Sequence, residues 1–173
     1  MRPPPIRAAL TAVCAALLLT GCWAPMPPRA DYPTPKVTPP AGMTAVEWAW
    51  FGFAMPSEWQ LRTGSGSTNH WVDSTGATRA SADITTILEC PSKTRPEPLQ
   101  TGITNRASIS GTAPLRVPGA AGGFRYELTG DPEGPRSELH AWLPNCEKQL
   151  WITVFDESPT VDRIAETIVA QQD

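Results

Sequence analysis

The sequence predicts an α+β fold, a mostly antiparallel β-sheet with a C-terminal helix packed on one face. Two patterns carry this prediction. Apolar residues alternate with polar ones in several short segments, as they do in strands with one face on a core. The final segment instead repeats apolar residues at helical spacing, and such a stripe must cover something apolar. The sheet is the only candidate, so we expect a layer of helix on a layer of sheet.

Five segments between residues 43 and 155 have the pattern of strands. In the first segment, the apolar residues change from even-numbered to odd-numbered positions near Gly52. This strand therefore either bulges there or is covered on both faces. In the last, Trp151 and Phe155 have the opposite parity from the main apolar set, which is typical of a central strand buried on both sides. The five segments are 48–55, 80–88, 124–128, 139–143 and 150–155. In the proline-rich stretch 91–116 we place only a strand around 103–109.

The chain ends in a segment with a helix start signal. Ser158 is the expected N-cap, Pro159 takes the first helical position, and Asp162 follows in the first turn. The apolar stripe falls at i, i+3, i+4, i+7 and i+8 and consists of Val161, Ile164, Ala165, Ile168 and Val169.

The first residues have the plan of an export signal. Arg2 and Arg7 precede an apolar run over 8–19 that ends at Leu19-Thr20-Gly21-Cys22. Such a run reaches only about 18 Å as a helix, so it cannot span a hydrocarbon core of roughly 30 Å. Its end resembles the lipobox of bacterial lipoprotein precursors, which implies a diacylglyceryl group on Cys22 and cleavage after Gly21. The alternative is an ordinary secretory signal cut near Ala24.

The remaining chain divides into a linker and one domain. Seven prolines crowd residues 23–42, and because proline favours an extended chain, 22–42 is predicted to be a semi-stiff spacer. Docking of a proline-binding partner on this stretch is the alternative. Residues 43–173 are expected to form a single α+β domain, since domains usually contain roughly 100 to 150 residues.

Charge and cysteine content bear on partners and compartment. Removing Arg2 and Arg7 from the 14 basic residues leaves 12 against 17 acidic ones, a formal net charge of −5 without a basic patch. We therefore expect no nucleic-acid partner, and anchoring must come from lipid. Once Cys14 is removed and Cys22 is lipidated, Cys90 and Cys146 remain, and an oxidising compartment favours a disulfide between them. Free or metal-bound thiols are the alternative.

Three segments resemble a known group, the PsbP-like fold found in small actinobacterial lipoproteins with a proline-rich stalk. The segments are 51–59 (FGFAMPSEW), 115–120 (LRVPGA) and the final strand and helix over 150–170. The resemblance implies a non-enzymatic domain that binds or scaffolds, because relatives serve as an extrinsic photosystem subunit and as accessory binding proteins. Relatives often carry a further helix midway, and the prolines between Cys90 and Arg116 depart from that pattern.

No catalytic motif stands in the sequence, and we predict no catalytic residue, metal site or cofactor. The two histidines, His70 and His140, lie in no metal-binding or nucleophile context, and His140 shares parity with Glu138 and Trp142. We expect ordinary sheet or surface positions for both. A glycosidase pair among the 17 acidic residues stays an alternative, because such a pair is defined by distance in space.

Tryptophan is the most suggestive remaining feature. Exposed tryptophans stack on sugars or anchor partner proteins, so Trp48, Trp50 and Trp71 are the candidate ligand or partner surface. Core packing is the alternative. The predicted function is that of a lipoprotein on the extracytoplasmic face of the bacterial cell membrane, acting as a non-catalytic binding or assembly module for an envelope protein. The alternatives are binding of a carbohydrate, such as a cell-wall glycan, or of a lipid, and hydrolysis of the cell wall.

Overall fold

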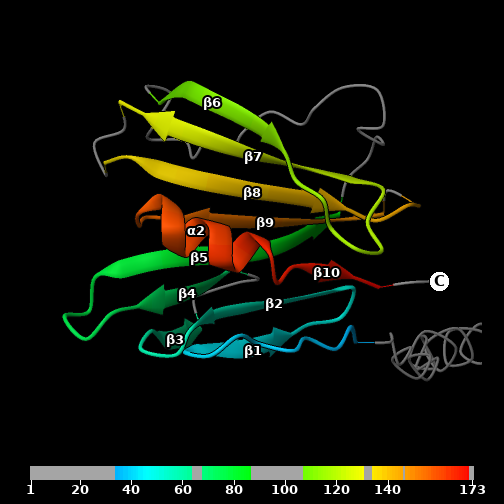
Figure 1. The fold of residues 1–173 in the computed structure, drawn as a ribbon, viewed down its shortest axis with the longest axis horizontal. Coiled ribbons are helices and arrows are strands. Elements are labelled where there is room, and N and C mark those ends of the chain that lie inside the picture. The colour runs from blue at the N-terminus through cyan, green and yellow to red at the C-terminus, as the bar shows by residue number, and fades with distance from the viewer. Residues whose placement is uncertain (1–33, 64–67, 87–106, 131–133, 146, 172–173) are drawn as a thin grey trace, which may run out of the picture. The chain divides into compact units, whose positions relative to one another are not determined.

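The computed structural model describes residues 34–63, 68–86, 107–130, 134–145 and 147–171 (Figure 1). In these ranges the chain forms two antiparallel sheets and one helix, which confirms the α+β class and the mostly antiparallel sheet. The predicted signal over 1–21, the lipidation site Cys22 and both cysteines of the predicted disulfide, Cys90 and Cys146, lie outside the described residues.

The larger sheet has seven strands in the order β3-β4-β5-β9-β8-β7-β6. Strand β9 stands in the middle of this order, as predicted for the segment around residue 152. Strand β6 extends from Ser108 to Pro114, further along the chain than predicted. The strands are β3 (Gln60–Thr63), β4 (Asn69–Val72), β5 (Thr78–Thr86), β6 (Ser108–Pro114), β7 (Gly122–Thr129), β8 (Arg136–Trp142) and β9 (Lys148–Val154).

The smaller sheet has the order β1-β2-β10, with β1 at Met43–Glu47, β2 at Phe51–Pro56 and β10 at Val169–Ala170. The expected single strand over 48–55 is wrong, because its first residues form a hairpin turn. Glu47 pairs with Gly52, and the Trp48 N–H donates to the Phe51 carbonyl at 3.0 Å. The parity change near Gly52 therefore marks the end of a turn rather than a bulge.

One face of the seven-stranded sheet, here called the core face, carries the apolar residues predicted for β5, β8 and β9. Ile152 lies opposite Ala82 on one side and Leu139 on the other, and paired residues of neighbouring strands share a face. All three are at most 2 % exposed and belong to one hydrophobic cluster with Phe53 of the smaller sheet. The alternation predicted in these strands is confirmed.

Strand β7 contributes its apolar residues to the opposite face, here called the far face. Arg125 pairs with Leu139, so Arg125 is on the core face and Phe124 and Tyr126 are on the far face. Tyr126 is nevertheless fully buried. Alternation identified the residues that share a face of β7, but they face away from the main hydrophobic cluster.

The helix, α2, spans Ser158–Ala165 and differs from the prediction at both ends. Its N-cap is Glu157, which has an extended backbone and makes no capping hydrogen bond through its side chain. Ser158 is therefore the first helical residue rather than the cap, and Asp162 lies beyond the first turn. Val161 and Ile164 are fully buried in the main hydrophobic cluster.

The predicted apolar stripe is cut short because the chain turns after α2 and forms β10. The Thr167 hydroxyl donates to the Ile164 carbonyl at 2.7 Å and accepts from the Ala54 N–H at 2.8 Å, which fixes the turn against β2. Val169 then pairs with Gly52. The β-branched residues over 167–169 favour a strand over a helix, so side-chain chemistry outweighs the helical spacing here.

The end of the predicted linker lies against the domain. Val37 packs on the hydrophobic cluster, and its N–H donates to Glu47 Oε1 at 3.2 Å. Lys36 Nζ lies 2.9 Å from the other oxygen of the same carboxylate. A Cβ atom on Gly52 would come within 2.5 Å of Val37, so glycine gives the linker room to cross β2. In the described ranges, no helix has the length and apolar character needed to cross a membrane.

Candidate functional site

The three tryptophans predicted as a binding surface are not arranged as one exposed row. Trp71 is 3 % exposed and lies in a ring cluster with Trp48 and Phe53, with centroids 5.1 to 6.2 Å apart. Trp48 and Trp50 are half-buried and pack on the hydrophobic cluster. Trp71 therefore acts in core packing in this structure, which was the alternative interpretation.

Trp50 has a backbone conformation that is unusual for its residue type. Its φ angle is 76°, in the left-handed region that L-residues other than glycine, asparagine and aspartate rarely adopt. Its carbonyl accepts from the Gln171 N–H at 2.8 Å, and Lys148 Nζ lies 4.9 Å from the ring centroid. The β1–β2 turn is thus fixed to the C-terminal segment and to the start of β9.

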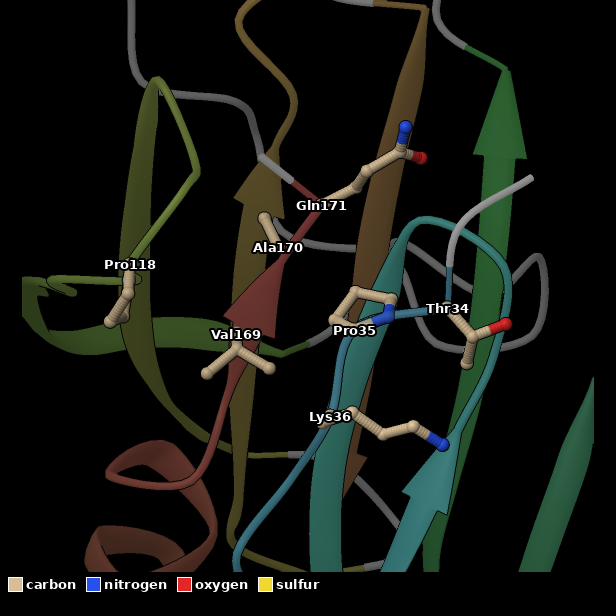
Figure 2. A pocket seen from close by; sticks show the side chains of 7 residues that line it. All are labelled: Thr34, Pro35, Lys36, Pro118, Val169, Ala170 and Gln171. Atoms are coloured by element: carbon tan, nitrogen blue, oxygen red, sulfur yellow. The ribbon is translucent and has the colours of Figure 1, made fainter. Parts of the chain in front are cut away.

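A groove of about 310 Å³ lies where the linker meets β10 (Figure 2). The linker supplies one wall, and β10 with the residue that follows it supplies the other. Apolar side chains form most of the lining, with Thr34, Lys36 and Gln171 as polar members. The lining residues are Thr34, Pro35, Lys36, Pro118, Val169, Ala170 and Gln171.

A larger hollow of about 480 Å³ lies at one end of the seven-stranded sheet, and we call it the charged hollow. Register explains why its residues meet: β9 ends where β5 and β8 begin, because Val154 pairs with both Ala80 and Ser137. The start of α2 closes one side. The lining residues are Arg79, Ser110, Glu127, Leu128, Thr129, Pro135, Arg136, Ser137, Phe155, Asp156, Glu157 and Ser158.

Arg79 is held in the charged hollow by an acidic turn outside it. Its Nε lies 2.7 Å from Asp73 Oδ2. The hydroxyl of Thr75 donates to Asp73 at 2.5 Å, and the Thr75 and Ala77 N–H groups donate as well. These bonds, the Thr75 hydroxyl first and then Arg79, hold the pKa of Asp73 far below its usual range, although partial burial acts in the opposite direction. A carboxylate fixed in this way orients the Arg79 guanidinium.

Glu127 is held in a similar way from the core face. Arg125 Nε lies 2.5 Å from one carboxylate oxygen, and the Ser137 hydroxyl donates to the other at 2.7 Å. Arg125 also pairs with Asp162 of α2. The two carboxylate oxygens of Glu127 are therefore fixed by Arg125 of β7 and Ser137 of β8, and Asp162 of α2 holds Arg125 in turn.

A buried polar array runs inward from the charged hollow along the far face of β8. Arg136 lines the hollow, and its Nε is 3.5 Å from Glu138 Oε1. Glu138 Oε2 lies 3.1 Å from His140 Nε2, and Gln149 Nε2 lies 3.4 Å from His140 Nδ1. The His140 ring stacks on Trp151, with centroids 4.6 Å apart. All four polar residues of the array are at most 4 % exposed.

The two histidines considered from sequence are not brought together. His140 is buried on β8, whereas His70 is half-buried on β4, and β5 and β9 lie between these strands. Three strand spacings separate them by roughly 14 Å. Among the described residues, no group of three or more histidines, cysteines and acids is placed to hold a metal ion.

The chain matches no protein-family model, and no curated protein is significantly similar to it. The PsbP-like resemblance stays a sequence-based expectation.

Sequence reasoning found single members of these sites but not the sites themselves. The shared parity of Glu138 and His140 was visible in the sequence. The charged hollow joins segments from β5 to the start of α2 that are far apart in the chain, and no local motif marks it. Only the strand order, with β9 between β5 and β8, brings these segments together.

Proposed function

We propose that this protein is a lipid-anchored, extracytoplasmic lipoprotein that acts as a non-catalytic binding module for a partner in the cell envelope. Its working surface is the charged hollow. The lipobox supports the anchor on Cys22, and the following prolines support a spacer between anchor and domain.

The observation that carries this proposal is the placement of the charged hollow relative to the linker. The chain enters the described part at Thr34, beside Gln171, whose N–H bonds to Trp50. Trp50 lies under Lys148, the first residue of β9. The charged hollow adjoins Phe155, just after the last residue of β9. Linker and hollow are therefore at opposite ends of the central strand, as Figure 1 shows for the blue start of the described chain and the start of α2.

This arrangement suits a module displayed on a tether. A tether attached at one end leaves the other end free to meet a partner away from the bilayer. The fixed side chains of the charged hollow suit binding, because groups that are already oriented lose less entropy on association.

We also infer that α2 packs on the core face of the seven-stranded sheet. Val161 and Ile164 belong to the same buried cluster as Leu139 and Ile152, and Asp162 pairs with Arg125 on that face. In this position α2 fixes the wall of the charged hollow that its first residues form.

Site-specific photo-crosslinking in intact cells tests the proposed function. A photoreactive amino acid replaces Glu157 in the charged hollow or, as the matched control, exposed Lys36 in the linker. We expect an adduct with an envelope component from position 157 and none of the same size from position 36. Equal adducts from both positions, or none from position 157, would overturn the proposal.

Carbohydrate binding is the second candidate function. It is favoured by one observation, the presence of the Phe155 ring among the polar groups of the charged hollow.

A further inference from the structure

The end of the domain where the linker enters, here called the linker end, presents an aromatic ring beside a basic side chain. Trp50 is half-exposed, and Lys148 Nζ lies 4.9 Å from the centroid of its ring. Tryptophan and lysine are the side chains that anchor proteins at the headgroup level of a bilayer, because each joins an apolar body to a polar tip. This pair therefore has the chemistry of a membrane-interface anchor.

The Trp50 ring is held in place by its backbone. Its φ of 76° is costly for tryptophan and persists because neighbouring segments fix it, among them Gln171, whose N–H donates to the Trp50 carbonyl at 2.8 Å. Part of the ring packs on the hydrophobic cluster, and the rest is accessible. An anchor that is already fixed loses little entropy when it docks.

The surroundings of Trp50 allow a flat surface to approach. The connection between β6 and β7 lies at the same end, because Ala170 donates its N–H to the Pro118 carbonyl at 2.8 Å and Ala121 donates to the carbonyl of Trp142, the last residue of β8, at 2.9 Å. Pro118 and Ala121 are exposed. Their side chains are short, apolar and uncharged, so they present no barrier to a bilayer surface.

The described charges of the linker end have a positive excess. Lys36 and Glu47 lie 2.9 Å apart and neutralise each other. Arg116, exposed in the connection between β6 and β7, and Lys148 are then two basic residues against one acidic residue, Glu147, in the described part of this end.

The charged hollow at the opposite end has the opposite sign. Its two arginines are both engaged by acidic partners, whereas Asp156 and Glu157 add two negative charges. The seven residues of β9 separate the two ends by roughly 23 Å, which exceeds the Debye length of about 8 Å at physiological salt. An anionic surface therefore attracts the domain at the linker end and repels it at the charged hollow.

We propose that the linker end docks on the anionic surface of the bilayer that holds the lipid on Cys22, with Trp50 at the headgroups and Arg116 and Lys148 beside the phosphates. This inference rests on the lipid anchor of the proposed function. The 12 residues from Cys22 to Pro33 span at most about 40 Å, so the surface is always within reach and a weak contact suffices. Docking in this way points the charged hollow away from the bilayer.

Photo-crosslinking of the purified lipoprotein to phospholipid vesicles tests the inference. The vesicles consist of phosphatidylcholine with about 30 % phosphatidylglycerol, the order of anionic content that attracts basic side chains. Benzoylphenylalanine replaces exposed Ala121 at the linker end or, as the matched control, exposed Thr129 at the charged hollow. Mass spectrometry measures the yield of phospholipid adducts, and co-flotation with the vesicles measures anchoring separately.

We expect a much higher adduct yield from position 121 than from position 129, and loss of this excess in pure phosphatidylcholine. Arg116→Gln should lower the yield from position 121 about fivefold, the usual effect of one basic residue near an anionic surface. Arg62→Gln removes the same charge from an exposed position on β3 and should leave the yield unchanged. Trp50→Gly, which fits the φ of 76°, should lower the yield as well.

Equal adduct yields from positions 121 and 129, or an unchanged yield in pure phosphatidylcholine, would overturn the inference. If the lipoprotein floats with the vesicles but position 121 gives no adduct, the anchor of the proposed function stands and the docking is wrong. If the lipoprotein does not float with the vesicles, the anchor and the docking both fail.

Discussion

The imidazole Nε2 of His140 lies 3.1 Å from Oε2 of Glu138, and both residues are only 1 % exposed. The tautomer with its hydrogen on Nε2 donates to the carboxylate and leaves Nδ1 to accept from Gln149. Arg136 adds a cation on the other side of Glu138. Glu138 thus lies between Arg136 and His140 and contacts both.

Removing Glu138 should therefore destabilise the domain strongly. We expect Glu138→Leu to lower the free energy of unfolding by about 3 kcal/mol or more, because Arg136 and His140 lose an acceptor in a buried place. Glu138→Gln should cost less, since its amide keeps an acceptor oxygen. Urea denaturation measures both, with exposed Glu58→Gln as a control expected within about 0.5 kcal/mol of the parent. A Glu138→Leu variant as stable as the parent would contradict this role.

Asp73 should make stability depend on pH in the acid range. Its pKa is lowered in the folded protein, chiefly by the Thr75 hydroxyl and then by Arg79. The contribution is therefore complete above about pH 4, the usual carboxyl pKa, and is lost as the pH falls toward the lowered value. Thermal unfolding of the parent and of Asp73→Asn should differ most at pH 6 and converge at lower pH. A difference that stays constant down to the acid limit would refute the linkage.

Trp50 allows the cost of its left-handed backbone to be measured. Trp50→Ala and Trp50→Gly both remove the ring from Lys148, but only glycine adopts a φ of 76° without steric cost. We expect Trp50→Gly to be more stable than Trp50→Ala by about 1 kcal/mol in urea denaturation. Equal stability of the two variants would show that the turn relaxes when the ring is lost.

The proposed Cys90–Cys146 disulfide can be tested through stability. Thr86, the last residue of β5, pairs with Lys148, the first residue of β9, and the two cysteines follow and precede these paired positions. A bridge closing about 57 residues would contribute roughly 4 kcal/mol on the chain-entropy account. Cys90→Ser, Cys146→Ser and the double variant should lose stability equally. Additive losses in the double variant would rule out a shared bond.

Local patterns predicted β5, β7, β8 and β9 and part of β2, because alternation directly reflects which residues of a strand share a face, but they did not predict β1, β3, β4 or β10. They did not show which face meets the core, so Phe124 and Tyr126 lie on the far face although their strand was correctly predicted. Local patterns also failed at α2, because the helical spacing of apolar residues continues in the sequence through Ile168 and Val169. Pairing with β2 and the Thr167 hydroxyl, neither visible in local spacing, ended the helix at Ala165.

Even less of the candidate site than of the fold could be predicted from the sequence. Trp71 was selected for its residue type, and its burial depends on Trp48 and Phe53 from the smaller sheet. The charged hollow depends on strand order, which brings Arg79 and Arg136 to the same end of β9. Strand order is set by packing across the whole domain, so no single segment encodes it.

Blocking the charged hollow tests the central claim most directly. Ser158 lines the hollow and is exposed, so Ser158→Trp should fill it without disturbing the core. Thr38→Trp places the same side chain at an exposed position in the linker and is the control. The measurement is the fraction of lipoprotein recovered in complex with its envelope partner after crosslinking in cells. We expect Ser158→Trp to reduce this fraction severely and Thr38→Trp to leave it unchanged; equal recovery of both variants would contradict the account.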